Sequence, residues 1–208
     1  MIQSAIKQDT TSPVGIVDRP AGLSAIRDPL FGAAIWWREF DSGCQSWLNA
    51  LAPEQLPNAR TIVKPVAVGE TVSRICDASG TPDCPKRAVF VGDVAALADT
   101  FTGIMDAPWL RLRLAVVTTN ACRKFHVDAI TARLVCTYRG TGTQYGVSVG
   151  DAAPDQVFTT PTAAPIVMRG TKWDTGVGLL HRSPPIEGTG ETRLVLVLDP
   201  VMELEDDF

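Results

Sequence analysis

The C-terminal half of the chain consists of short runs in which apolar and polar residues alternate. The run WLRLRLAVV, residues 109–117, alternates as a strand does when one of its faces meets water. Six further segments of this kind follow, separated by turn residues: one around His126, and the runs ARLVCTYR, QYGVSV, APIVMRG, GVGLLH and TRLVLVLD. Seven strands within about 90 residues, with no helical pattern between them, are typical of a barrel or a jelly roll.

The N-terminal half shows helical spacing instead. An apolar stripe at that spacing runs from Leu30 to Leu51. Asp28 is placed as its N-cap, before Pro29 at the first helical position. Gly43 is expected to divide the stripe into two helices.

Two further segments complete the N-terminal half. β-Branched residues and turn breakers predict an extended conformation for residues 58–76. Apolar periodicity predicts a helix over the second half of residues 87–107, with Asp93 as its N-cap.

These patterns predict an α+β protein with three regions. Residues 1–22 are polar and contain two prolines, and are expected to be a mobile segment. Residues 23–108 are expected to form a helical and extended part that packs on the β-barrel. Residues 109–208 are expected to form the β-barrel domain, with any metal site in it.

Composition and charge narrow the classes of function. The chain has 208 residues, of which 45% are hydrophobic and 20% charged, a balance typical of globular proteins. A net charge of −4 leaves no excess of cations for a phosphate backbone, so nucleic-acid binding is not expected. No apolar run approaches the roughly 20 residues of a membrane span, and no secretory signal is visible. We therefore expect a cytoplasmic protein without a membrane partner.

The five cysteines do not form a recognisable framework. Their irregular spacing and the lack of a C-x-x-C pair argue against paired disulfides and against a structural zinc ribbon. Cys76 and Cys84 are expected to be ordinary loop cysteines. Cys122 and Cys136 have two interpretations: buried free thiols, which are the commoner state, or neighbours of a metal. A thiolate ligand would favour zinc over iron.

The two histidines of the chain are the main candidates for chemistry. His126 and Asp128 are two residues apart, so in a strand they project from the same face. His181 ends an apolar run 55 residues later, and strands that far apart can be neighbours in a barrel. Two imidazoles and one carboxylate leave three positions of a metal open, as non-haem Fe(II) oxygen chemistry requires. The alternative is that His126 bonds locally to Asp128 while His181 caps a strand.

Arg193 adds a fourth candidate, 12 residues after His181. A guanidinium matches a carboxylate with two parallel hydrogen bonds. In a strand beside that of His181, Arg193 would hold the far carboxylate of a metal-chelating keto acid. Ser183 has no histidine left to act as its base, which argues against a serine-hydrolase triad.

The order H-x-D, distant His, then Arg resembles the Fe(II)/2-oxoglutarate-dependent dioxygenase superfamily over residues 109–200. The resemblance implies a double-stranded β-helix, a jelly-roll or cupin-like barrel. It also implies that His126, Asp128 and His181 bind iron and that Arg193 binds the C5 carboxylate of 2-oxoglutarate. Many members place a Ser or Thr two residues after the arginine, where this chain has Val195. Tyr138 is the expected substitute hydroxyl at the co-substrate.

The whole chain also resembles an uncharacterised bacterial family known as a domain of unknown function, on the segments NACRKFHVD, LVCTYRGTGTQYG and LLHRSPPIEGTGETRLVLVLD. That resemblance implies no activity. Metal homeostasis, with a metal-delivery protein as a candidate partner, is kept as an expectation beside it. Three functions stay open. The first is a hydroxylase-type oxygenase that uses Fe(II) and 2-oxoglutarate on an unknown small-molecule or protein substrate. The second is a non-catalytic Zn²⁺-binding module with a fourth ligand, expected to be a cysteine. The third is a cupin-like metalloenzyme without a keto acid.

Overall fold

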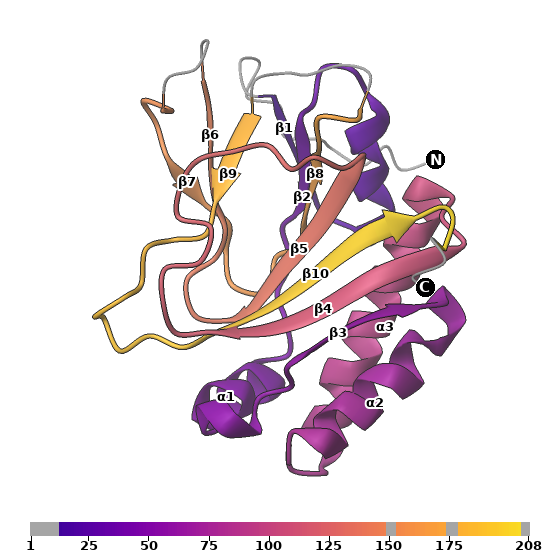
Figure 1. Cartoon of the computed structure of the whole chain (residues 1–208), viewed down its shortest axis with the longest axis vertical. Helices are drawn as coiled ribbons and strands as arrows, with labels where there is room; N and C mark the ends of the chain where they lie inside the picture. The colour runs from indigo at the N-terminus through magenta and orange to yellow at the C-terminus, as the bar shows by residue number, and fades with distance from the viewer. Residues whose placement is uncertain (1–12, 149–152, 174–178, 205–208) are drawn as a thin grey trace.

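Two β-sheets form the centre of the molecule (Figure 1). The computed structural model describes residues 13–148, 153–173 and 179–204. The larger sheet has seven strands in the order β1-β2-β8-β5-β10-β4-β3, and its neighbouring strands are antiparallel except for β1 and β2. Its strands are β1 Val14–Val17, β2 Ala33–Trp36, β3 Ala59–Val63, β4 Trp109–Val117, β5 Ala132–Arg139, β8 Ile166–Arg169 and β10 Arg193–Val201.

The smaller sheet has three strands in the order β7-β6-β9. Backbone hydrogen bonds between His126 and His181 add the segment around His126 beside β9. The two sheets face each other, because Leu179 of the smaller sheet belongs to one apolar cluster with Val135 and Val195 of the larger one. The strands of the smaller sheet are β6 Gln144–Val147, β7 Phe158–Thr159 and β9 Leu179–Arg182.

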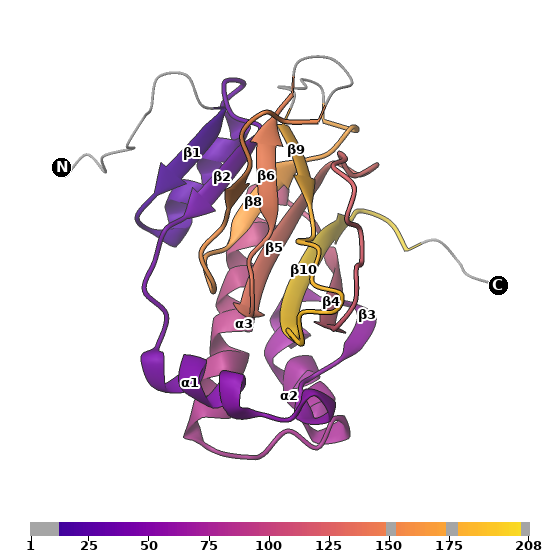
Figure 2. The same ribbon diagram turned by 90° about the vertical axis from the view of Figure 1, so that its left-hand side faces the viewer.

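The helices pack on the opposite face of the larger sheet (Figure 2). Strand alternation separates the two faces. Leu194, Leu196 and Leu198 of β10 are fully buried in the helix-side core, whereas Val195 and Val197 face the smaller sheet. The helices are α1 Ser42–Ala50, α2 Val68–Ala78 and α3 Pro85–Met105, with the 3-10 helices η1 Pro20–Arg27, η2 Pro53–Gln55 and η3 Pro65–Ala67.

The helical prediction for Leu30 to Leu51 is correct only for the second part of this segment. Its second part is α1, whose N-cap Asp41 accepts a hydrogen bond from the Cys44 amide at 2.6 Å. Its first part is β2, and Asp28 ends η1 instead of starting a helix. A short apolar run such as AAIW fits a buried strand between two neighbours as well as it fits a helix, and periodicity alone does not separate the two.

The extended prediction for residues 58–76 holds for β3 and is wrong for α2. The buried residues Val68, Val72 and Cys76 of α2 recur every four residues, a helical spacing that the β-branched composition obscured. The next helix, α3, starts at Pro85, so Asp93 lies inside it instead of capping it.

The C-terminal half matches its prediction more closely. Six of the seven predicted strands are present, as β4, β5, β6, β8, β9 and β10, while the segment around His126 forms a single bridge. The α+β class is therefore confirmed. Of the segment predicted to be mobile, residues 1–12 lie outside the described residues, and residues 13–22 contain β1 and the start of η1.

One helix of the described part, α3, is long and apolar enough by composition to cross a membrane, with a mean hydropathy of 1.5 over its most apolar window. Its side chains Phe90, Val94 and Phe101 are fully buried in the core beneath the larger sheet. Of the residues in that window, 33% are buried inside the structure.

Candidate metal centre

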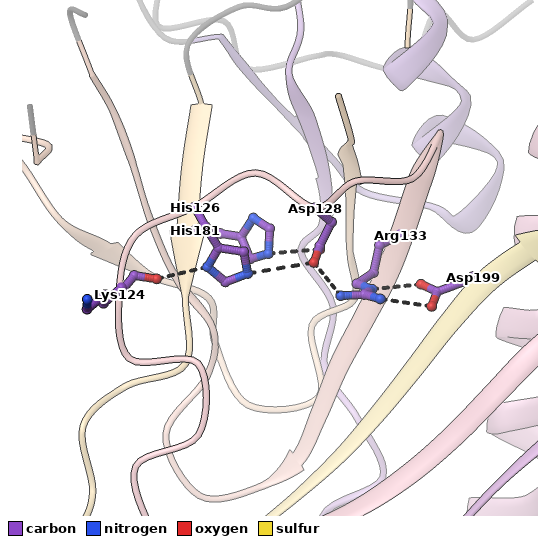
Figure 3. A network of polar contacts seen from close by, with 6 residues as sticks. All are labelled: Lys124, His126, Asp128, Arg133, His181 and Asp199. Carbon is purple, nitrogen blue, oxygen red and sulfur yellow. Dashed lines mark hydrogen bonds and ion pairs between the residues drawn. The ribbon is translucent and has the colours of Figure 1, made fainter. Parts of the chain in front are cut away.

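Two imidazoles face each other at the edge of the smaller sheet. The backbones of His126 and His181 exchange both N–H···O hydrogen bonds, each at 3.0 Å, so the two residues lie directly opposite one another. Opposed residues project to the same face. Their ring centroids are 4.5 Å apart (Figure 3). A single bridge thus brings together residues far apart in the chain.

Asp128 completes a group of three candidate ligands. Its Oδ2 lies 3.1 Å from Nε2 of His181, and its Oδ1 lies 3.6 Å from Nε2 of His126. One candidate ligand atom from each residue lies within 4.8 Å of the others. Metal–nitrogen bonds of about 2.0–2.1 Å place neighbouring ligands about 3 Å apart. The group has the composition of a two-histidine, one-carboxylate site.

The loop that carries Asp128 is tied to the end of β8. The amide of Thr171 donates to the carbonyl of Asp128 at 2.9 Å, and the amide of Gly170 donates to that of Thr131 at 2.8 Å. A Cβ at position 170 would overlap the carbonyl of Ile130 and approach that of Asp128 to 2.7 Å. Glycine is needed here because of this close approach.

The carboxylate of Asp128 is oriented by Arg133, which sequence reasoning missed. Arg133 Nη1 donates to Oδ1 of Asp128 at 2.6 Å, while its Nε and Nη2 donate to the two oxygens of Asp199 at 2.7 and 2.8 Å (Figure 3). Oδ2 of Asp128 is buried and has no hydrogen-bond partner among the described residues apart from its contact with Nε2 of His181, itself a candidate ligand. One oxygen is thus held by the protein, and the other is left for a metal.

The protonation states suit metal binding. Burial alone would raise the pKa of Asp128, but His181, Arg133 and His126 together lower it below its usual value, so the carboxylate is ionised. Nδ1 of His126 lies 2.8 Å from the carbonyl of Lys124. If Nδ1 carries the proton, it donates to that carbonyl and leaves the Nε2 lone pair for a metal. The residues present therefore fit a divalent ion.

The imidazoles open on a cavity of about 230 Å³ between the two sheets. Arg193 lines the same cavity and is 1% exposed. Its Nε donates to the Thr141 carbonyl at 2.6 Å and its Nη2 to the Thr137 hydroxyl at 3.3 Å, while the buried Nη1 has no partner among the described residues. Burial lowers the pKa of Arg193 to about 10, although the nearby Glu191 carboxylate acts in the opposite direction. The guanidinium therefore stays charged at neutral pH. A buried cation with a free donor attracts an anion.

The expected role of Tyr138 does not agree with the structure. Tyr138 is fully buried on the helix side of β5, and its hydroxyl donates to Asp93. The hydroxyl beside Arg193 belongs to the adjacent residue, Thr137, which faces the cavity side. Tyr138 shares a strand face with Leu134 and Cys136, and that alternation was the available signal.

The cysteines do not extend the group of ligands. Cys136 is buried on the helix side, and burial raises the pKa of its thiol to about 12. Cys122 lines the cavity but does not belong to the group of candidate ligands found among the described residues. Cys76 lies inside α2 instead of in a loop, and Cys84 is the residue before α3. All five thiols are free.

Comparison with known proteins shows the family and the fold of the chain. No curated protein matches the sequence. The fold is similar to that of AtDAO1, a dioxygenase for auxin oxidation from Arabidopsis thaliana solved with 2-oxoglutarate, at a TM-score of 0.55 and 10% identity over 95% of both chains. Weaker likenesses are a full-length Neurospora crassa protein solved in complex with alpha-KG (TM-score 0.42, 14% identity, 96% of this chain and 88% of that one) and a Pseudomonas putida prolyl-4-hydroxylase (0.38, 13%, 80% and 97%). A family model matches residues 17–199, and the chain belongs to that family, described as a protein of unknown function (DUF1826).

Proposed function

We propose that this protein is an Fe(II)- and 2-oxoglutarate-dependent oxygenase of the hydroxylase type. The observation that carries the proposal is the cavity that both imidazoles and the buried Arg193 line together. A metal-bound keto acid needs a metal ion with free coordination positions at one end and a cationic side chain for its far carboxylate at the other. This cavity offers candidates for both. The two facing sheets support the finer inference that the fold is a double-stranded β-helix.

In this proposal His126, His181 and Oδ2 of Asp128 would hold the iron. When bound, Fe(II) with 2-oxoglutarate supplies the oxidising power to hydroxylate a C–H bond with O2, as the keto acid is converted to succinate and CO2. Arg133 keeps the carboxylate of Asp128 in place. The tautomer of His126 follows from its contact with the Lys124 carbonyl.

Arg193 would bind the C5 carboxylate of the co-substrate. Its unpartnered Nη1 offers a charge-assisted hydrogen bond, and Thr137 adds a hydroxyl beside it. The apolar side chains of Val135, Val195 and Val197 line the cavity and limit the water around the reacting centre.

The test is an anaerobic titration of Fe(II)-loaded protein with 2-oxoglutarate, followed by exposure to air. We expect a weak visible absorption band that needs both components, and succinate formation after oxygen is admitted. Asp128→Asn should lose both signals because a charged ligand is removed. Asp99→Asn, an exposed carboxylate on α3, is the matched control. Retention of the band and of succinate in Asp128→Asn would falsify the assignment.

The other two functions are outcomes of the same titration. Tight retention of zinc with no response to 2-oxoglutarate would identify the metal-binding module, whose partner would be a metal-delivery protein. Oxygen uptake without a keto acid would identify the cupin-like enzyme.

A further inference from the structure

Three arginines gather on the cavity side of the larger sheet, at its β3–β4 edge. Arg60 of β3 and Arg113 of β4 are directly opposed in the register, and Arg111 lies two residues before Arg113. Leu110, Leu112 and Leu114 point into the helix-side core, so the intervening arginines project to the other face. We call Arg60, Arg111 and Arg113 the arginine cluster.

Within the described part of the chain, the arginine cluster lacks a neutralising partner. None of its three side chains forms an ion pair or hydrogen bond with any residue that the structure describes. Asp199 is directly opposite Arg111 in the register, but both of its oxygens accept from Arg133. Like charges opposed across two strands destabilise a sheet. Arg60 and Arg113, opposed across β3 and β4, are therefore not placed to stabilise the sheet.

Through Arg113, the arginine cluster reaches the cavity of the candidate metal centre. Arg113 lines the same cavity as His126, His181 and Arg193. Two residues along a strand advance roughly 7 Å, and opposed Cβ atoms are about 4.5–5.5 Å apart. Three long side chains at that spacing can converge on one anionic group. Arg60 and Arg113 are exposed and Arg111 is half-buried, so solutes reach them.

We propose that the arginine cluster binds a carboxylate or phosphate group of the primary substrate, which is an anionic small molecule. This inference rests on the proposed function, and it adds the substrate class. Arg193 and Arg113 of the cluster lie at separate positions of one cavity wall, because Arg113 is opposite Val197, four residues after Arg193 in β10. The co-substrate and the substrate would thus each have a cation of their own.

The test uses the full-length, metal-free protein, so that its result does not depend on iron or on the keto acid. Isothermal titration at low ionic strength is performed with inorganic phosphate and, separately, with acetate. We expect saturable binding of at least one anion to the wild type. The double variant Arg111→Gln/Arg113→Gln should bind at least tenfold more weakly, and Arg60→Gln should show a smaller loss.

Arg74→Gln is the matched control, because Arg74 is an exposed arginine of α2 that lies outside the cavity lining. It should bind the anions as the wild type does. Binding of phosphate alone assigns a phosphorylated substrate, and binding of acetate assigns a carboxylate. The inference is overturned if neither anion binds saturably, if the double variant binds like the wild type, or if only Arg193→Gln abolishes binding. A failed succinate assay with intact anion binding removes the oxygenase and leaves an anion site.

Discussion

The two faces of the larger sheet differ in whether their buried charged atoms have hydrogen-bond partners. On the helix side, Arg38 donates to both oxygens of Asp93 at 2.6 and 2.7 Å, and Tyr138 donates to the same carboxylate. On the cavity side, Oδ2 of Asp128 and Nη1 of Arg193 are buried and lack a hydrogen-bond partner among the described residues.

This difference distinguishes charged residues that stabilise the fold from charged residues that are placed to bind a ligand. Burying a polar atom without a hydrogen-bond partner costs free energy on either face, so a folded protein tolerates it where a ligand supplies the missing partner. Of the four buried side-chain atoms without a partner in the described part of the chain, the two charged ones line or adjoin the candidate metal centre. The neutral ones are Nε1 of Trp36 and Oγ1 of Thr102. Each prediction below changes a residue on one of the two faces.

The largest effect is expected from Asp93→Ala on the helix side. It leaves Arg38 buried without its carboxylate, which should lower the free energy of unfolding by about 3 kcal/mol. Chemical denaturation measures the loss, and Asp99→Ala on the exposed surface of the same helix is the control. Metal affinity should be unchanged, and a variant that loses metal but keeps its stability would contradict the separation of the two faces.

Gly170→Ala should disturb the candidate metal centre through the backbone. The new Cβ overlaps the carbonyl of Ile130, so the loop that carries Asp128 must move. We expect a loss of about 2–3 kcal/mol in stability, with weaker Fe(II) binding in an equilibrium titration. Gly92→Ala is the control, because a Cβ there meets no other atom within 4 Å. Wild-type metal affinity in Gly170→Ala would show that the tie between the loop and β8 does not position Asp128.

Arg133→Gln should weaken the metal site without removing a ligand. Loss of the orienting contact to Oδ1 of Asp128 is expected to reduce Fe(II) affinity by about 10- to 100-fold. Competition with a chelator measures the change. Arg133→Lys should restore only part of the affinity, because an ammonium does not reproduce the fork that joins Asp128 to Asp199. Equal affinities in all three proteins would assign Arg133 a purely structural role.

The smallest effect is expected from Thr137→Val, which preserves side-chain shape and removes the hydroxyl beside Arg193. We expect the affinity for 2-oxoglutarate to fall about fivefold, since one hydrogen bond contributes about 1 kcal/mol. Tyr138→Phe, one residue away on the helix side, should affect stability and not co-substrate affinity. The reverse result would restore Tyr138 as the co-substrate hydroxyl.

Local rules account for what could be predicted. Alternation with a period of two identified β4, β5 and β10 and placed Tyr138 on the face of Leu134 and Cys136. The same alternation does not say which face meets the helices, and therefore it does not distinguish Tyr138 from Thr137 as the hydroxyl at the co-substrate. Periodicity predicts a helix for the run that forms β2, because the burial of this strand depends on β1 and β8, which flank it from distant parts of the chain.

By itself, the sequence determined that the chain has strands with one apolar face, and that its two histidines, one nearby aspartate and one following arginine are the candidates for metal and co-substrate binding. Only the tertiary structure decided that His126 and His181 pair across one bridge, that Arg133 holds Asp128, and that Arg60 and Arg113 are opposed. The alternation of apolar and polar residues in a strand is a local pattern over a few residues, so the sequence alone reveals it. Register between distant strands is set by the packing of the whole core, and that register decides which charges meet.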